Sequence, residues 1–119
     1  MSKTLVFGAS LKPNRYSNLA VKRLVENKKE TLAYGPREGN ICGIEVSTNF
    51  EDFQDVHTIS LYLNPKNQLE YYQAIIDLGP KRVIFNPGTE NPEFYELLQS
   101  HEIEVEVACT LVLLATGQY

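Results

Sequence analysis

The residues best suited to chemistry lie in one loop, Gly8-Ala9-Ser10-Leu11-Lys12-Pro13-Asn14-Arg15-Tyr16-Ser17, which follows a short apolar run. A glycine that closes a strand lets backbone amides approach a phosphate, and a following helix adds unpaired N–H groups with partial positive charge. Ser10 and Ser17 would add hydroxyl donors, and Lys12 and Arg15 could neutralise a diphosphate. The spacing differs from G-x-G-x-x-G, because Ser10 and Pro13 stand two and five positions after Gly8. The loop is therefore either a phosphate cradle or an ordinary connection without a ligand.

The next candidate loop bears on which phosphate ester would bind. NAD-binding folds place a carboxylate near the end of their second strand, where it holds the ribose hydroxyls. Here the chain reads Ala33-Tyr34-Gly35-Pro36-Arg37, and no carboxylate comes before Glu38. This pattern argues against NAD. Arg37 could instead face the extra ribose phosphate of NADP or coenzyme A, or it could simply extend into solvent.

Two further turns could line the same crevice. Leu63-Asn64-Pro65 starts a predicted helix, and Asn86-Pro87-Gly88 ends a predicted strand. Each turn is also consistent with a purely structural role. Tyrosines such as Tyr16, Tyr62, Tyr71 and Tyr72 pack in cores more often than they stack on ligands, and no binding role is assigned to Tyr71 or Tyr72.

The elements that must position these loops alternate in type. Apolar, β-branched runs predict strands at 4–8, 31–34, 44–46, 57–63, 82–86 and 103–107, and helical spacing predicts helices between most of them and at 111–115. Short strand–helix connections imply parallel pairing, in the order 44–46, 31–34, 4–8, 57–63, 82–86, 103–107. The predicted fold class is α/β: a Rossmann-like, doubly wound, mainly parallel sheet of five to six strands with helices on both faces, in a single domain over 1–119. Ligands of such sheets bind where the strand order reverses, here between 4–8 and 57–63.

Composition narrows the classes of partner. The chain has 119 residues, 43% of them hydrophobic, with a net charge of −4 and no run long enough to span a membrane. A net acidic chain lacks the broad positive field that nonspecific binding to nucleic acid or an anionic membrane requires. Two cysteines and no secretory leader predict a cytoplasmic protein with reduced thiols. The apolar end at 111–114 predicts a core helix or a dimer surface, and so a monomer or weak homodimer.

Taken in order, these segments resemble a known family. The resemblance rests on Gly8-Ala9-Ser10 with Pro13 and Arg15-Tyr16-Ser17, Gly35-Pro36-Arg37-Glu38-Gly39, Leu63-Asn64-Pro65, Asn86-Pro87-Gly88-Thr89-Glu90 and Ala108-Cys109-Thr110. It covers 3–119 and is to the small stand-alone CoA-binding proteins, whose fold is that of the amino-terminal domain of the succinyl-CoA synthetase alpha subunit. The resemblance implies that the 8–17 loop cradles the CoA phosphates and that Pro36 and Arg37 lie near the adenosine phosphate. It also implies that Leu63, Asn64 and Pro87 line the path of the adenine and pantetheine.

The chain also departs from the synthetase. The lysine-bearing Gly-Lys-Gly-Gly run of that enzyme reads Arg37-Glu38-Gly39-Asn40 here, and the domain that carries its phosphorylated histidine has no counterpart within 1–119. His57 and His101 have no phosphoryl-transfer setting, and the cysteines and histidines lack zinc spacing. Ligase activity is therefore not expected from this chain alone.

Cys109 is the remaining candidate for chemistry. It follows the last predicted strand, near the start of the terminal helix, where a thiolate would be stabilised. It could form a mixed disulfide with the thiol of bound CoA, or it could be a small packing residue. The expected function is non-covalent binding of coenzyme A or an acyl-CoA without catalysis. The alternatives are an NADP-type oxidoreductase, a redox protein that captures CoA through Cys109, and a regulatory subunit with an unknown protein partner.

Overall fold

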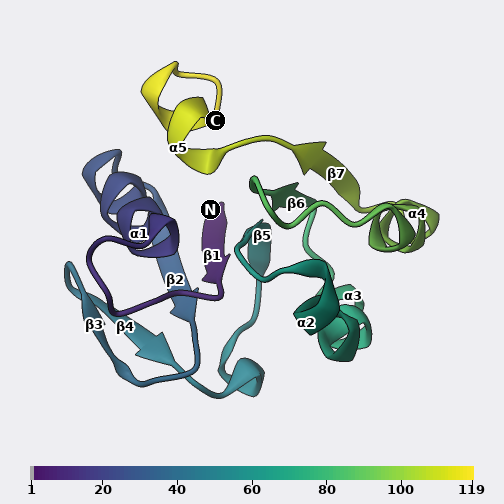
Figure 1. Cartoon of the computed structure of the whole chain (residues 1–119), viewed down its shortest axis with the longest axis horizontal. Helices are drawn as coiled ribbons and strands as arrows, with labels where there is room; N and C mark the ends of the chain where they lie inside the picture. The colour runs from purple at the N-terminus through teal and green to yellow at the C-terminus, as the bar shows by residue number, and fades with distance from the viewer. Residues whose placement is uncertain (1) are drawn as a thin grey trace.

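A seven-stranded sheet in the order β3-β4-β2-β1-β5-β6-β7 forms the centre of the molecule, and the computed structural model describes residues 2–119 (Figure 1). The strands are β1 (Lys3–Phe7), β2 (Glu30–Tyr34), β3 (Gly39–Ile41), β4 (Ile44–Ser47), β5 (Val56–Leu61), β6 (Arg82–Phe85) and β7 (Glu104–Val107). The helices are α1 (Tyr16–Glu26), α2 (Pro65–Gln68), α3 (Tyr72–Leu78), α4 (Pro92–Ser100) and α5 (Thr110–Ala115), with 3-10 turns η1 (Phe50–Asp52) and η2 (Leu69–Tyr71).

The predicted order of six strands is confirmed, and the sheet is a Rossmann-like α/β fold. β3 is the addition. It pairs antiparallel with β4, whereas the other pairs are parallel, so the sheet has seven strands and mixed orientation instead of five to six strands. β3 is three residues long and opens with Gly39 and Asn40, two residue types that are depleted in strands, so its sequence does not predict a strand.

Two hydrophobic cores cover the two faces of the sheet. Successive strand residues point to opposite faces, so Leu5 and Phe7 of β1 join one core and Val6 joins the other. The first core contains residues of α3 and α4, and the second contains residues of α1 and α5. Figure 1 shows α1 and α5 as neighbours, away from α3 and α4. The two helical layers therefore sandwich the sheet and leave its carboxyl edge to the loops.

The helix boundaries refine the predictions at the candidate loops. Ser17 and Asn18 are residue types that typically cap helices, but α1 begins one residue earlier, at Tyr16, with Arg15 at the N-cap. The helix expected after Asn64 does begin at Pro65, with the Asn64 side chain as its cap, but it is interrupted by η2 before α3. Within residues 2–119, no helix has the length and apolar character needed to cross a membrane.

Candidate functional site

The loop from Gly8 to Arg15 leaves β1 at the carboxyl edge of the sheet and crosses over the end of β2. The backbone amides of Gly8 and Ala9 both donate to the carbonyl oxygen of Tyr34, each at 2.9 Å. On the other side of β1, the amide of Tyr62 donates to the carbonyl of Phe7 at 2.9 Å. The loop is thus fixed at the point where the strand order reverses, between β1 and β5.

Two glycines allow the backbone to come this close. Gly8 has φ +95°, a left-handed conformation that other residues adopt only with strain. Gly35 follows β2 beneath the loop, and a β carbon placed there would stand 2.2 Å from the carbonyl oxygen of Ala9. Both glycines were predicted as site residues. Gly35 matters because the β1–α1 loop lies directly on its α carbon.

The two serines of the loop bond within the loop. The amide of Ser10 donates to Oγ of Ser17 at 3.1 Å, and the amide of Lys12 donates to Oγ of Ser10 at 3.2 Å. Nδ2 of the buried Asn18 donates to the carbonyl of Ser10 at 2.8 Å, which ties the loop to α1. These contacts give Ser10 and Ser17 a shaping role, in addition to the donor role that the sequence predicts for them.

The first turn of α1 directs unpaired backbone N–H donors toward the β1–α1 loop. Its N-cap, Arg15, makes no side-chain capping bond, and within residues 2–119 the amides of Tyr16 and Ser17 have no protein acceptor. Unpaired amides and the helix dipole together favour an anion at this end of the helix. Tyr16 itself is 72% exposed, so its ring extends away from the core.

A cationic pocket of about 410 Å³ opens beside this helix end. Its lining residues are Ala9, Ser10, Leu11, Lys12, Arg15, Pro36 and Arg37. No carboxylate is among them, and none of the three cationic side chains forms an ion pair within residues 2–119. Three uncompensated cations around one hollow make it attractive to a polyanion.

An aromatic pocket of about 310 Å³ adjoins the cationic pocket and shares Pro36 with it. It is lined by Phe7, Gly8, Tyr34, Gly35, Pro36, Leu63, Asn67, Glu70 and Tyr71. The ring of Phe7 lies 4.9 Å from that of Tyr34 and 5.0 Å from that of Tyr71, centroid to centroid. The Tyr34 and Tyr71 hydroxyls are hydrogen-bonded to each other at 3.4 Å, and this bond, by favouring the protonated form of Tyr71, is the main cause that raises the pKa of Tyr71 to about 12.

Most residues of the aromatic pocket were not predicted from the sequence. Tyr71 was given no binding role, and Tyr34, Asn67 and Glu70 were not singled out. One signal was available: positions 67, 70 and 71 are three and four residues apart, so they share one face of the helix that follows Leu63. The other half of the pocket depends on which strands are neighbours.

The predicted site residues divide into two groups by position. The two pockets bring together Gly8, Ala9, Ser10, Arg15, Gly35, Pro36, Arg37 and Leu63. Lining neither pocket are Pro13, Tyr16, Ser17, Asn64, Asn86, Pro87, Gly88 and Cys109. Pro87 and Gly88 are exposed on the loop that follows β6, at the same carboxyl edge.

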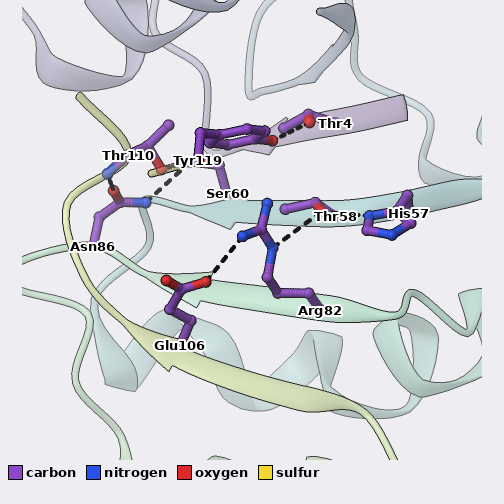
Figure 2. A network of polar contacts seen from close by, with 9 residues as sticks. All are labelled: Thr4, His57, Thr58, Ser60, Arg82, Asn86, Glu106, Thr110 and Tyr119. Carbon is purple, nitrogen blue, oxygen red and sulfur yellow. Dashed lines mark hydrogen bonds and ion pairs between the residues drawn. The ribbon is translucent and has the colours of Figure 1, made fainter. Parts of the chain in front are cut away.

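Asn86 is 0% exposed and joins three elements (Figure 2). Its Nδ2 donates to Oγ of Ser60 at 3.1 Å and to the carbonyl of Leu61 at 2.9 Å, and its Oδ1 accepts from the amide of Thr110 at 2.8 Å. The side chain is therefore taken up by internal bonds that hold β5, β6 and the start of α5 together.

Cys109 occupies the N-cap of α5, next to this network, and is half-buried. The nearby Tyr62 hydroxyl is buried and has no hydrogen-bond partner within residues 2–119. Ser60 and Thr110, which lie near it, bond to each other at 2.7 Å. Burial is the main cause that raises the pKa of Tyr62 to about 12.

The other polar network drawn in Figure 2 lies toward the opposite end of the sheet. Arg82, the first residue of β6, pairs with Glu106 at 2.9 Å, and its guanidinium stacks on the ring of Tyr119 at 4.7 Å. The His57 ring bonds to the neighbouring Thr58 hydroxyl at 2.8 Å. This network ties strands together and does not reach the two pockets.

The comparisons with known proteins agree with this fold. The chain matches the CoA binding domain family over residues 2–115, and it belongs to that family. It is 44% identical to an uncharacterised protein of known crystal structure, with a TM-score of 0.95 and coverage of 100% of this chain and 98% of that one. A Thermus thermophilus protein is 21% identical (TM-score 0.87, 99% and 90% coverage), and a Pyrococcus horikoshii hypothetical protein is 27% identical (TM-score 0.83, 93% and 80%). No curated protein matches the sequence.

Proposed function

We propose that this protein binds coenzyme A, or an acyl-CoA, non-covalently in the cationic and aromatic pockets and catalyses no reaction of its own. One observation carries the proposal. Lys12, Arg15 and Arg37 surround a single pocket without a carboxylate among its lining residues, on a chain whose net charge is −4. Coenzyme A presents a diphosphate and a ribose phosphate, which together need several cationic partners.

The positions of the cations suggest how the phosphates divide among them. Arg15 and Lys12 lie at the start of α1, beside the unpaired amides of its first turn, and there they would hold the diphosphate. Arg37 follows β2, the strand whose end contacts the adenosine ribose in folds of this class, and it would hold the ribose phosphate.

The aromatic pocket suits the adenine. Tyr34 and Tyr71, whose rings pack against the buried Phe7, supply ring surface against which a flat base can pack, and Pro36 is shared between this pocket and the cationic pocket. Its volume of about 310 Å³ is at the lower end of the usual range for small-molecule sites. The pantetheine arm would then leave along the loops that follow β5 and β6.

Isothermal titration with coenzyme A, NADP, NAD and ADP-ribose tests the proposal. We expect coenzyme A to bind most tightly, by about tenfold or more over NAD and ADP-ribose, which lack a ribose phosphate. Equally weak binding of all four compounds would contradict the assignment. Tighter binding of NADP than of coenzyme A would favour the oxidoreductase alternative.

Mass spectrometry tests whether binding is non-covalent. The protein is incubated with CoA disulfide, and the intact mass is expected to stay unchanged. A mass gain of one CoA moiety, located at Cys109 and absent from Cys109→Ser, would contradict the non-covalent proposal in favour of thiol capture.

A further inference from the structure

Gln68 is the last residue of α2 and is 0% exposed, which is unusual for a glutamine. Every hydrogen-bonding group of its side-chain amide has a use. Nε2 donates to the carbonyl oxygens of Leu63 and Thr89, each at 2.9 Å, and Oε1 accepts from Nδ2 of Asn91 at 2.9 Å. One buried side chain thus joins the loop that follows β5 to the loop that follows β6.

The joined loops are held further along by polar contacts. Nδ2 of Asn91 also donates to the Tyr72 hydroxyl at 2.8 Å, and that hydroxyl donates to Glu93 at 3.0 Å. At the base of the β6 loop, the Thr89 hydroxyl donates to the carbonyl of Asn86 at 2.7 Å. Gln68 bonds directly to both loops, whereas Tyr72 reaches the second loop from α3, so the spacing of the two loops depends on Gln68.

The two loops lie beside the proposed ligand site, so the distance between them bears on ligand binding. The cationic and aromatic pockets lie around the ends of β1 and β2, and the ends of β5 and β6 continue the same edge of the sheet, so a ligand longer than a nucleotide can extend past them. Leu63, which lies in one of the joined loops, also lines the aromatic pocket. Pro87 and Gly88 are exposed on the other loop.

We propose that Gln68 is a positioning residue that sets the gap between these two loops for the pantetheine arm of coenzyme A. This inference rests on the proposed function. Gln68 touches no ligand. It acts through Leu63 on one side and the 87–89 segment on the other, and it leaves the nucleotide half of the site unaffected.

The test compares two ligands in one variant. Gln68→Met keeps a similar volume but removes all three hydrogen bonds. Isothermal titration is done with coenzyme A and with adenosine 3′,5′-bisphosphate, which has no pantetheine. We expect coenzyme A to bind roughly tenfold more weakly to the variant, and the bisphosphate to change by less than about twofold.

Two further variants separate positioning from general stability. Gln68→Glu keeps the acceptor for Asn91 but replaces the two donors, so it should lose coenzyme A affinity selectively, as Gln68→Met does. Leu98→Ala, in the core of α4, lowers the thermal midpoint without touching either loop, and it should leave the ratio of the two affinities unchanged.

The possible results separate a failure of the positioning role from a failure of the proposed function. If wild-type protein does not bind coenzyme A, the proposed function fails. If wild type binds coenzyme A, but Gln68→Met weakens both ligands equally or neither, the positioning role is overturned. It is also overturned if wild type binds coenzyme A no more tightly than the bisphosphate, because the arm then makes no useful contact.

Discussion

The carbonyl oxygen of Ala9 lies 2.2 Å from the point where a β carbon on Gly35 would stand. No side chain fits between these two backbones, and the neighbour in question is a carbonyl that is part of the β1–α1 loop. The loop that carries Ser10, Lys12 and Arg15 therefore keeps its position only while position 35 is glycine. The residue type at position 35, at the end of β2, therefore determines the conformation of the loop that follows β1.

Replacing Gly35 with alanine should lift the loop off β2. We expect coenzyme A to bind about tenfold or more weakly, with a lower thermal midpoint, because the amides of Gly8 and Ala9 would lose the Tyr34 carbonyl. Titration and thermal denaturation measure the two effects. Gly39→Ala is the comparison: its β carbon would meet only the flexible Leu11 side chain, at 2.6 Å, so its effect should be smaller. Equal losses of affinity in Gly35→Ala and Gly39→Ala would show that the contact between Gly35 and the Ala9 carbonyl does not fix the loop.

Arg37→Ala should weaken coenzyme A far more than dephospho-coenzyme A, which lacks the ribose phosphate. The loss of one charge-assisted contact costs about 1.5–3 kcal/mol, or roughly 10- to 100-fold in Kd. Titration of both ligands measures the difference. Arg23→Ala removes a cation that already pairs with Glu26 on the exposed side of α1, and it should change neither affinity. Equal weakening of both ligands by Arg37→Ala would remove the assignment of that phosphate.

Tyr62→Phe should stabilise the protein at neutral pH, because it removes a buried hydroxyl without a partner. The expected gain in the free energy of unfolding is about 1 kcal/mol. Since the folded-state pKa of Tyr62 is about 12 against an ordinary value of 10.0, its ionisation has no effect on wild-type stability below pH 10 and lowers that stability as the pH rises toward 12.

Denaturant titrations at neutral and alkaline pH measure both effects of Tyr62→Phe. The variant should lose less stability between pH 10 and 12 than wild type does. Some loss should remain, because the pKa of Tyr71 is also raised to about 12. A variant less stable than wild type at neutral pH would show that the hydroxyl has a partner after all.

Asn86→Ala should lower the free energy of unfolding by more than the loss of a small side chain would suggest. The substitution strips bonds from Ser60, Leu61 and the amide of Thr110, and buried groups would be left unpaired. We expect a loss of about 2–4 kcal/mol in the free energy of unfolding. Asn40→Ala removes one exposed turn bond and should cost less than about 1 kcal/mol. Similar losses in the two variants would mean that the Asn86 network is not central.

The strand order could be predicted because it follows from local patterns and handedness. Runs such as 57–63 are apolar and β-branched, and right-handed crossovers leave few arrangements of parallel strands. β3 could not be predicted, because Gly39 and Asn40 have little strand propensity of their own and pair only because β4 lies alongside. Tertiary contact overrides propensity there.

The cationic pocket could be predicted from one loop and one neighbouring strand end, because Lys12, Arg15 and Arg37 follow strands that the topology makes adjacent. The aromatic pocket could not. Tyr34 and Tyr71 are 37 positions apart, and their hydroxyls meet only after β1, β2 and the helix following β5 are packed. The bond from the Ser10 amide to Oγ of Ser17 could not be predicted for the same reason, since it depends on the conformation of the loop.

Leu11 rests on the bare backbone of Gly39, so the tip of the β1–α1 loop is seated on the β3–β4 hairpin at the rim of the sheet. A polyanion gripped by Lys12 and Arg37 would press the tip and the hairpin together, although no atom of β3 lines the pocket. Binding of the ligand would then slow the exchange of the hairpin's amide hydrogens with solvent. Hydrogen exchange at β3, the shortest strand of the sheet, would therefore detect the bound ligand.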